Sequence, residues 1–203
     1  MNINNDNYRQ FTIFILILVG ISTGLTYALS YLLQLNGIIA PFYIEMPSVP
    51  GIYALLFLLF DRYLWKEHHL HPIFKKLGVI VSDDLNGKWQ GIVKTSYDDF
   101  KSNIKAELNI EQTATSIKIR GIFNESKSVS VHENFSLSEI DNKVALFYFF
   151  RNEPSYDAVK TMAIHEGSTK LIYDNKSDTL AGYYYSGRDR NNHGTIKVRR
   201  IKK

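Results

Sequence analysis

The chain has 203 residues, enough for a membrane anchor and one soluble domain of ordinary size. It carries 24 Lys and Arg against 20 Asp and Glu, and almost all of these charges follow residue 65. The absence of cysteine excludes disulfides and thiolate metal sites. The composition therefore divides the chain into an apolar N-terminal part and a charged, soluble C-terminal part.

The first predicted element is a membrane-spanning helix at residues 11–35, which contain no charged side chain. As a helix this segment would be about 37 Å long, which exceeds the ~30 Å thickness of the hydrocarbon layer. The residues before it carry no net positive charge, and the apolar run is too long for the core of a signal peptide. We therefore expect an uncleaved helix.

A second membrane helix is predicted near residues 47–65, which completes a transmembrane hairpin at residues 1–65. The densely apolar run 51–60 is its centre. Pro47 and Pro50 favour a start near residue 47, because proline fits the first turn of a helix better than its interior. A buried or re-entrant helix is the alternative, but a single crossing would leave this apolar run unexplained.

The flanking charges predict the orientation of the hairpin. The loop at residues 36–50 has no Lys or Arg, whereas Arg62, Lys66, Lys75 and Lys76 follow the second helix. By the positive-inside rule both termini lie in the cytoplasm. We expect a multi-pass protein of the bacterial inner membrane.

Two rows of small residues along the first helix predict close helix packing. One row consists of Gly20, Gly24 and Ala28, and the other of Ser22, Thr26 and Ser30. Either row is suited to packing against the second helix of the same chain. Two rows leave one face available for self-association.

Residues 66–84 are expected to connect the hairpin to a β domain at residues 85–203. In that domain apolar residues alternate in short runs separated by turn-forming residues. The pattern predicts strands near 87–97, 103–112, 115–124, 127–139, 143–152, 159–166, 168–175, 180–187 and 194–201. With some of these segments merging, they form an all-β, antiparallel up-and-down barrel of about eight strands.

The sequence contains no catalytic constellation. His165 and Glu166 are neighbours, so on a strand they point to opposite faces and cannot act jointly. His68, His69 and His71 lack a partner at a metal-binding spacing. We therefore expect neither an enzyme nor a metal site, and no cofactor.

The most informative stretch for ligand binding lies near the C-terminal end of the β domain. Tyr183 and Tyr185 share one face of a strand, and Arg188 and Arg190 lie in the loop that follows. Aromatic rings stack on bases and guanidinium groups bind phosphates, so this set suits a nucleotide with two bases and two phosphates. A tyrosine-rich barrel wall with a solvated loop is the alternative. Further candidates are Tyr148, Arg151 and His165.

Several short motifs occur in a recognisable order. Gly87-Lys88-Trp89 resembles the opening of lipocalins, in which the indole plugs the closed end of the barrel. Two membrane spans lead into residues 85–91, and residues 148–154, 165–167 and 180–194 follow. This succession covers nearly the whole chain and resembles the two-transmembrane β-barrel effectors of CBASS, the bacterial cyclic-oligonucleotide anti-phage system.

The resemblance implies a function for the chain. Such effectors bind a cyclic dinucleotide in a lipocalin-like barrel, oligomerise, and disrupt the inner membrane, which kills the infected cell. The implied partners are the cyclic dinucleotide, membrane lipid and further copies of the chain, with no DNA or RNA. A membrane-tethered carrier of an apolar ligand and a scaffolding protein are the alternatives.

Overall fold

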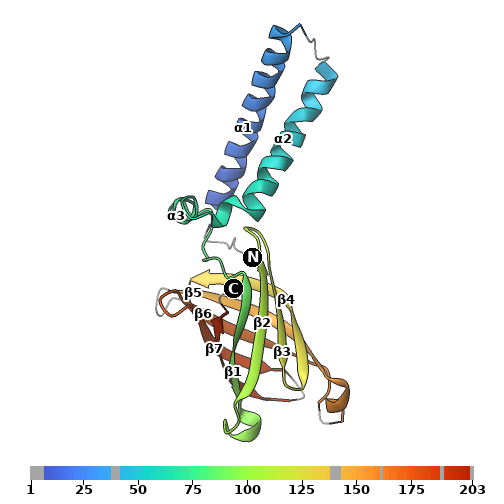
Figure 1. Ribbon diagram of the computed structural model, residues 1–203, viewed down its shortest axis with the longest axis vertical. Coiled ribbons are helices and arrows are strands. Elements are labelled where there is room, and N and C mark those ends of the chain that lie inside the picture. Colours follow the sequence, from blue (N-terminus) through green and yellow to red (C-terminus); the bar gives the residue numbers. More distant parts are fainter. Residues whose placement is uncertain (1–6, 38–41, 138–142, 161, 188–189, 202–203) are drawn as a thin grey trace. The chain divides into compact units, whose positions relative to one another are not determined.

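The computed structural model describes residues 7–37, 42–137, 143–160, 162–187 and 190–201. The chain forms two compact units, which divide between Val81 and Ser82 (Figure 1). The first unit contains the helices α1 (Tyr8–Leu35) and α2 (Phe42–Arg62), the short 3-10 helix η1 (Leu64–Lys66) and the helix α3 (His71–Lys76). The second unit contains all the strands.

The two long helices lie side by side (Figure 1). Among the described residues, α1 alone is both long and apolar enough to cross a membrane. The second helix begins at Phe42, earlier than the expected start near residue 47, so Pro47 and Pro50 lie inside it. Proline is tolerated inside apolar helices, so these two residues do not mark its beginning.

The two rows of small residues on α1 have different environments. Ser22, Thr26 and Ser30 are buried within the helical unit. The Ser22 hydroxyl donates to Leu18 O at 2.7 Å and the Thr26 hydroxyl to Ser22 O at 2.9 Å, so both bond within α1. Gly20 and Gly24 have no described heavy atom within 4 Å of an added Cβ. The hydroxyl row therefore packs inside the hairpin, and the glycine row faces away from it.

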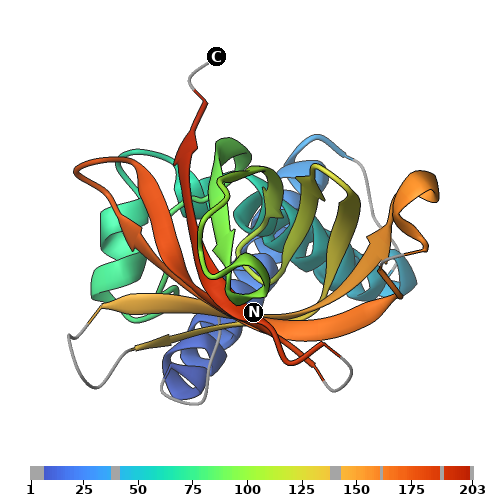
Figure 2. The same ribbon diagram turned by 90° about the horizontal axis from the view of Figure 1, so that it is seen from below.

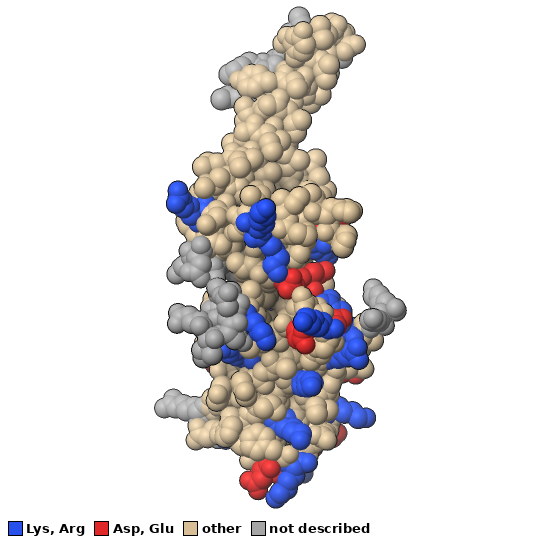
Figure 3. Space-filling view, turned by 90° about the vertical axis from the view of Figure 1, so that its left-hand side faces the viewer, with Lys and Arg blue, Asp and Glu red and all other residues tan. Residues whose placement is uncertain are grey.

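The segment after α2 packs against one end of the hairpin. The ring of Phe60 lies 4.4 Å from that of Phe14 and 5.1 Å from that of Phe74, measured between centroids. Trp65 is fully buried, and its carbonyl oxygen lies 2.9 Å from Nδ1 of His71. On the face shown in Figure 3, the Lys and Arg side chains of this unit gather at one end. No group of three potential metal ligands occurs among the described residues.

The second unit is a closed barrel of eight antiparallel strands, as the sequence predicted. Each strand pairs with the next, and the last strand pairs with the first. The strands are β1 (Gly87–Thr95), β2 (Ile104–Gln112), β3 (Ile117–Phe123), β4 (Ser126–Leu137), β5 (Val144–Pro154), β6 (His165–Asp174), β7 (Thr179–Ser186) and β8 (His193–Arg200). Two short 3-10 helices, η2 (Ser96–Asp98) and η3 (Tyr156–Ala158), lie in connections.

The prediction of a separate strand at residues 159–166 is wrong. The described part of this segment before His165 is not strand, and β6 begins at that histidine. Val159 and Ile164 are exposed, so their spacing does not mark a buried face. Alternation in the sequence predicts a strand only where one set of side chains is buried.

The closed half of the barrel is filled by apolar side chains. Strands β2 to β8 each contribute inner-face side chains to this core. The following are almost completely buried: Leu108, Ile110, Ile119, Phe135, Leu146, Leu171, Leu180 and Val198. Gly182 lies inside β7, and an added Cβ there would lie 1.8 Å from Lys170 O of the neighbouring strand. The close approach of the backbones therefore requires glycine at this position.

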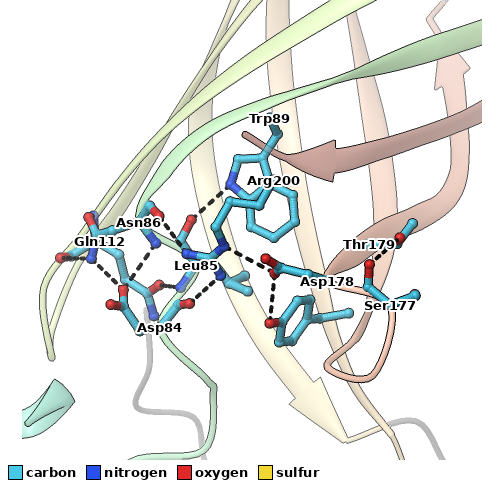
Figure 4. A network of polar contacts seen from close by, with 10 residues as sticks. Asp84, Leu85, Asn86, Trp89, Gln112, Ser177, Asp178, Thr179 and Arg200 are labelled. Carbon is cyan, nitrogen blue, oxygen red and sulfur yellow. Dashed lines mark hydrogen bonds and ion pairs between the residues drawn. The ribbon is translucent and has the colours of Figure 1, made fainter. Parts of the chain in front are cut away.

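Trp89 closes this end of the barrel, which confirms the predicted plug (Figure 4). It is completely buried, and its indole Nε1 donates to Leu85 O at 3.0 Å. The guanidinium carbon of Arg200 lies 4.4 Å from the centroid of the indole ring. A cation over a tryptophan face is an attractive arrangement, and it is strengthened when water is excluded.

Arg200 also joins the end of β8 to the residues before β1. It donates to Asn86 O at 2.6 Å and to Asp84 O at 2.7 Å. Its third contact is an ion pair with Asp178, whose Oδ1 lies 3.1 Å from Nε. The closed end is therefore held by charge-assisted hydrogen bonds as well as by the buried indole.

Candidate functional site

The opposite end of the barrel contains a cavity of about 430 Å³. In an up-and-down barrel alternate connections meet at the same end, and here the connections β1–β2, β3–β4, β5–β6 and β7–β8 surround the opening. Figure 2 views the barrel along its length from the end at which η2 lies. The volume lies in the ordinary range for small-molecule sites in proteins.

Aromatic rings from two strands form one wall of the cavity. Tyr148 and Phe150 point inward from β5, and Tyr184 points inward from β7. Tyr148 shares a hydrogen bond with Thr169, and burial raises the pKa of Tyr148 to about 12. Tyr184 shares a hydrogen bond with Thr95, and burial also raises its pKa. Both phenols are therefore neutral near pH 7 and can donate or accept hydrogen bonds.

Arg190 provides a positive charge at the cavity. Its guanidinium carbon lies 5.9 Å from the ring centroid of Tyr97, an exposed residue that also lines the cavity. Because a guanidinium group can make two parallel hydrogen bonds to a phosphate, Arg190 is suited to binding a phosphate at this end of the barrel.

His165 lines the cavity beside the aromatic wall. Its Nδ1 lies 3.0 Å from Ala163 O, and its ring is 6.5 Å from that of Phe150, edge to face. Burial lowers the pKa of His165, and the charge of Arg190 lowers it further. The imidazole is therefore mostly neutral at pH 7, and Nε2 is available to a ligand as a polar contact.

The remaining lining is polar as well as apolar. Asn152 and Ser126 are buried side chains with polar atoms on the cavity wall, and Asp98 adds a carboxylate. Ile104 and Ile196 contribute apolar surface. Walls of this mixed kind suit a ligand that has both rings and polar groups, and they suit a hydrocarbon chain less well.

The structure brings together three of the residues that the sequence suggested for ligand binding, namely Tyr148, His165 and Arg190. Arg151 lies on the outer face, where Nε is 3.5 Å from Oε1 of Glu153. The remaining arginine, Arg188, lies outside the described residues.

Tyr183 and Tyr185 share one face of β7, as expected, but this is the outer face of the barrel. Each is 58% exposed, and neither lines the cavity. The tyrosine that points inward is Tyr184, which lies between them. Side chains alternate between the two faces of a strand, so the buried Leu180 at the start of β7 already indicates that Tyr184 is on the inner face.

A barrel with one plugged end and a ligand-sized cavity at the other is the architecture of lipocalin-like binding proteins. The comparison with known proteins is more specific. Residues 82–200 match the family described as "Cap15, cyclic dinucleotide receptor domain", and the chain belongs to this family. The chain is also 27% identical to CD-NTase-associated protein 15 of Yersinia aleksiciae over 157 residues, which cover 76% of this chain and 70% of that protein. These findings confirm the resemblance to the CBASS effectors.

Proposed function

We propose that this protein is a membrane-anchored receptor of CBASS whose barrel binds a cyclic dinucleotide in the cavity at its open end. Binding drives self-association, and the assembled membrane helices disrupt the inner membrane and kill the cell. The observation that carries the proposal is the match of the barrel, residues 82–200, to the cyclic dinucleotide receptor family. The cavity with its aromatic wall and Arg190 supports it.

The chemistry of the cavity fits this ligand better than an apolar one. A cyclic dinucleotide offers two flat bases and two phosphates, and the cavity offers the rings of Tyr148, Phe150 and Tyr184 together with the guanidinium group of Arg190. A carrier of lipids would need a lining without buried polar groups, because each polar group left without a partner costs free energy. Asn152 is a buried polar side chain in this lining, and only the sulfur of Met162 accepts from its amide in the described hydrogen bonds.

Replacing Arg190 with alanine is expected to weaken binding of the cyclic dinucleotide by about 1.5–3 kcal/mol, because a charge-assisted hydrogen bond to phosphate is lost. The matched control is Arg151→Ala, which removes the same charge from the outer face of the barrel. Calorimetric titration of the detergent-solubilised chain measures both affinities. Equal affinities for the two variants would place the phosphates away from Arg190.

We also propose that α1 and α2 both cross the inner membrane, with both chain termini in the cytoplasm. The distribution of Lys and Arg around residues 36–50 supports this orientation. A reporter fused after Lys203 is expected to be cytoplasmic, and one inserted between Asn36 and Glu45 periplasmic. Two reporters on the same side of the membrane would contradict a hairpin that crosses twice.

Self-association is the step that connects binding to membrane damage in this proposal. A ligand shifts an equilibrium only when it binds one state more tightly than the other, and an assembled state supplies that difference. The outer face of the barrel exposes apolar side chains on β4, β5 and β7, namely Val131, Phe149, Tyr183 and Tyr185. Exposed apolar surface of this kind is suited to contact with a second copy.

A further inference from the structure

Three polar side chains form a row across the inner face of the barrel at its open end. Ser128 of β4 lies opposite Asn152 of β5, and Asn152 lies opposite His165 of β6. All three line the cavity. Residues that are paired across neighbouring antiparallel strands point to the same face, with their Cβ atoms about 5 Å apart. The row therefore presents three polar groups side by side to a ligand.

Asn152, at the centre of the row, has only a weak hydrogen-bond partner. It is 4% exposed, and its Nδ2 donates to the sulfur of Met162 at 3.6 Å. A thioether sulfur is a weak acceptor. No described residue donates to Oδ1, and this oxygen is not among the described atoms that are both unpaired and closed to solvent. Because buried polar groups nearly always have good partners, an accessible amide with so weak a contact is suited to a ligand that supplies better ones.

The two neighbours of Asn152 also have groups that a ligand can use. Nδ1 of His165 lies 3.0 Å from Ala163 O. A carbonyl oxygen only accepts hydrogen bonds, so Nδ1 carries the proton of the neutral ring and Nε2 is an acceptor. The Ser128 hydroxyl lies over Gly121, since a Cβ added to that glycine would be 2.5 Å from Oγ. The row therefore offers both acceptors and donors.

This chemistry does not suit a phosphate. A phosphate has no donors at neutral pH, so it would leave Oδ1 of Asn152 and Nε2 of His165 without hydrogen bonds. Arg190 in the same cavity is the natural partner of a phosphate. The donors of a cyclic dinucleotide are the N–H groups of its bases and the O–H groups of its riboses. Each base has an edge with an N–H beside an acceptor, and an amide complements such an edge with its own two groups.

Phe150 provides an aromatic surface next to the row. It points inward from β5 two residues before Asn152, which corresponds to about 7 Å along a strand. Its ring lies over Gly167 of β6, since a Cβ added to that glycine would be 2.5 Å from Cζ of the ring. The ring centroids of Phe150 and His165 are 6.5 Å apart. A base that stacks on Phe150 therefore has its polar edge within reach of the row.

We propose that the amide of Asn152 binds the polar edge of a base stacked on Phe150. Oδ1 accepts from a base N–H, and Nδ2 exchanges the sulfur of Met162 for the acceptor beside that N–H. Nε2 of His165 accepts from a further N–H where the base has one. Asn152 thereby determines which base the barrel accepts at this position. This inference rests on the proposed function of the cavity.

The first experiment measures calorimetric affinities of the full chain in detergent for a panel of cyclic dinucleotides that covers every pairing of adenine, guanine, cytosine and uracil. Asn152→Ala is expected to weaken the tightest member about 10- to 100-fold, the usual effect of losing a bidentate contact to a base. The matched control is Asn109→Ala, which removes the same side chain from β2. There the amide contacts Glu111 at 3.4 Å in an exposed position, so all affinities should be unchanged.

The second experiment changes the base preference. Asn152→Asp replaces the amide donor with a second acceptor, so the side chain pairs best with an edge that has N–H groups on two adjacent atoms. Among the four bases guanine alone has such an edge. The ratio of affinities for guanine-containing and adenine-containing members is expected to rise about 10-fold in favour of guanine. A purely structural role of Asn152 would weaken all members alike. If this variant does not fold, the base preference is measured with Asn152→Ala, where it should shrink about 10-fold.

The outcomes separate the inference from the function on which it rests. If the parent binds a cyclic dinucleotide and Asn152→Ala binds the panel with the same affinities, the inference is overturned and the proposed function stands. A 2′-deoxy analogue of the tightest ligand should lose the same factor with the parent and with Asn152→Ala. A loss confined to the parent would assign the amide to the ribose and overturn the inference. If the parent binds no member of the panel, both the function and the inference fail.

Discussion

Replacing Trp89 with alanine is expected to lower the free energy of unfolding of the receptor domain by about 3–5 kcal/mol, the usual range for a buried tryptophan. The indole is completely buried. Its loss would leave a cavity beneath the guanidinium group of Arg200 and would remove the hydrogen bond to Leu85 O. Urea denaturation of residues 82–203, followed by circular dichroism, measures the change.

The control for this prediction is Tyr183→Ala, which removes an aromatic side chain that is mostly exposed on the same barrel. A surface substitution of this kind usually changes stability by about 0.5 kcal/mol or less. If the two variants were equally stable, Trp89 would not be the plug of the closed end.

Replacing Gly24 with leucine is expected to abolish ligand-dependent permeabilisation of the membrane without changing ligand affinity. No described atom lies within 4 Å of an added Cβ at Gly24, so leucine fits the isolated chain. Bulk at this position would instead prevent the close approach of a second helix, which small residues allow. Dye entry into cells that make both the protein and its nucleotide signal measures permeabilisation.

Ile21→Leu is the matched control, because it changes an exposed apolar side chain of the same helix without adding bulk. Ser22→Leu is not suitable, since Ser22 is buried within the helical unit and leucine would disturb the hairpin itself. If the Gly24→Leu variant permeabilises the membrane as strongly as the parent does, the helices serve only as an anchor. The barrel would then have to cause the membrane damage.

The fold of the receptor domain follows from its sequence because alternation and turn residues are local signals. They predicted the closed barrel and most of its strands, and the motif Gly87-Lys88-Trp89 indicated the plugged end. The prediction of a strand at residues 159–166 was wrong because the apolar residues Val159 and Ile164 are exposed. The beginning of α2 could not be located from Pro47 and Pro50, since the helix continues through both.

The binding residues were harder to predict than the fold. Whether Tyr184 or its two neighbours face inward depends on the parity of β7, and a shift of one residue moves every side chain to the other face. Asp98 lies in an irregular loop whose position depends on contacts with β8, more than ninety residues later in the chain, as the hydrogen bond from His193 to Ser96 shows. Such contacts leave no periodic pattern in a single sequence.

The pairing of β8 with β1 also determines when the receptor can form during synthesis. The paired residues run from Trp89 opposite Arg200 to Thr95 opposite Gly194. During synthesis β1 therefore cannot complete its pairing until β8 has left the ribosome. Until then β1 and β7 have open edges, which invite pairing with other chains. The helices emerge much earlier. A chain that stops before β8 would therefore contain the helices without a closed barrel, so the cavity that β8 helps to line forms only after complete translation.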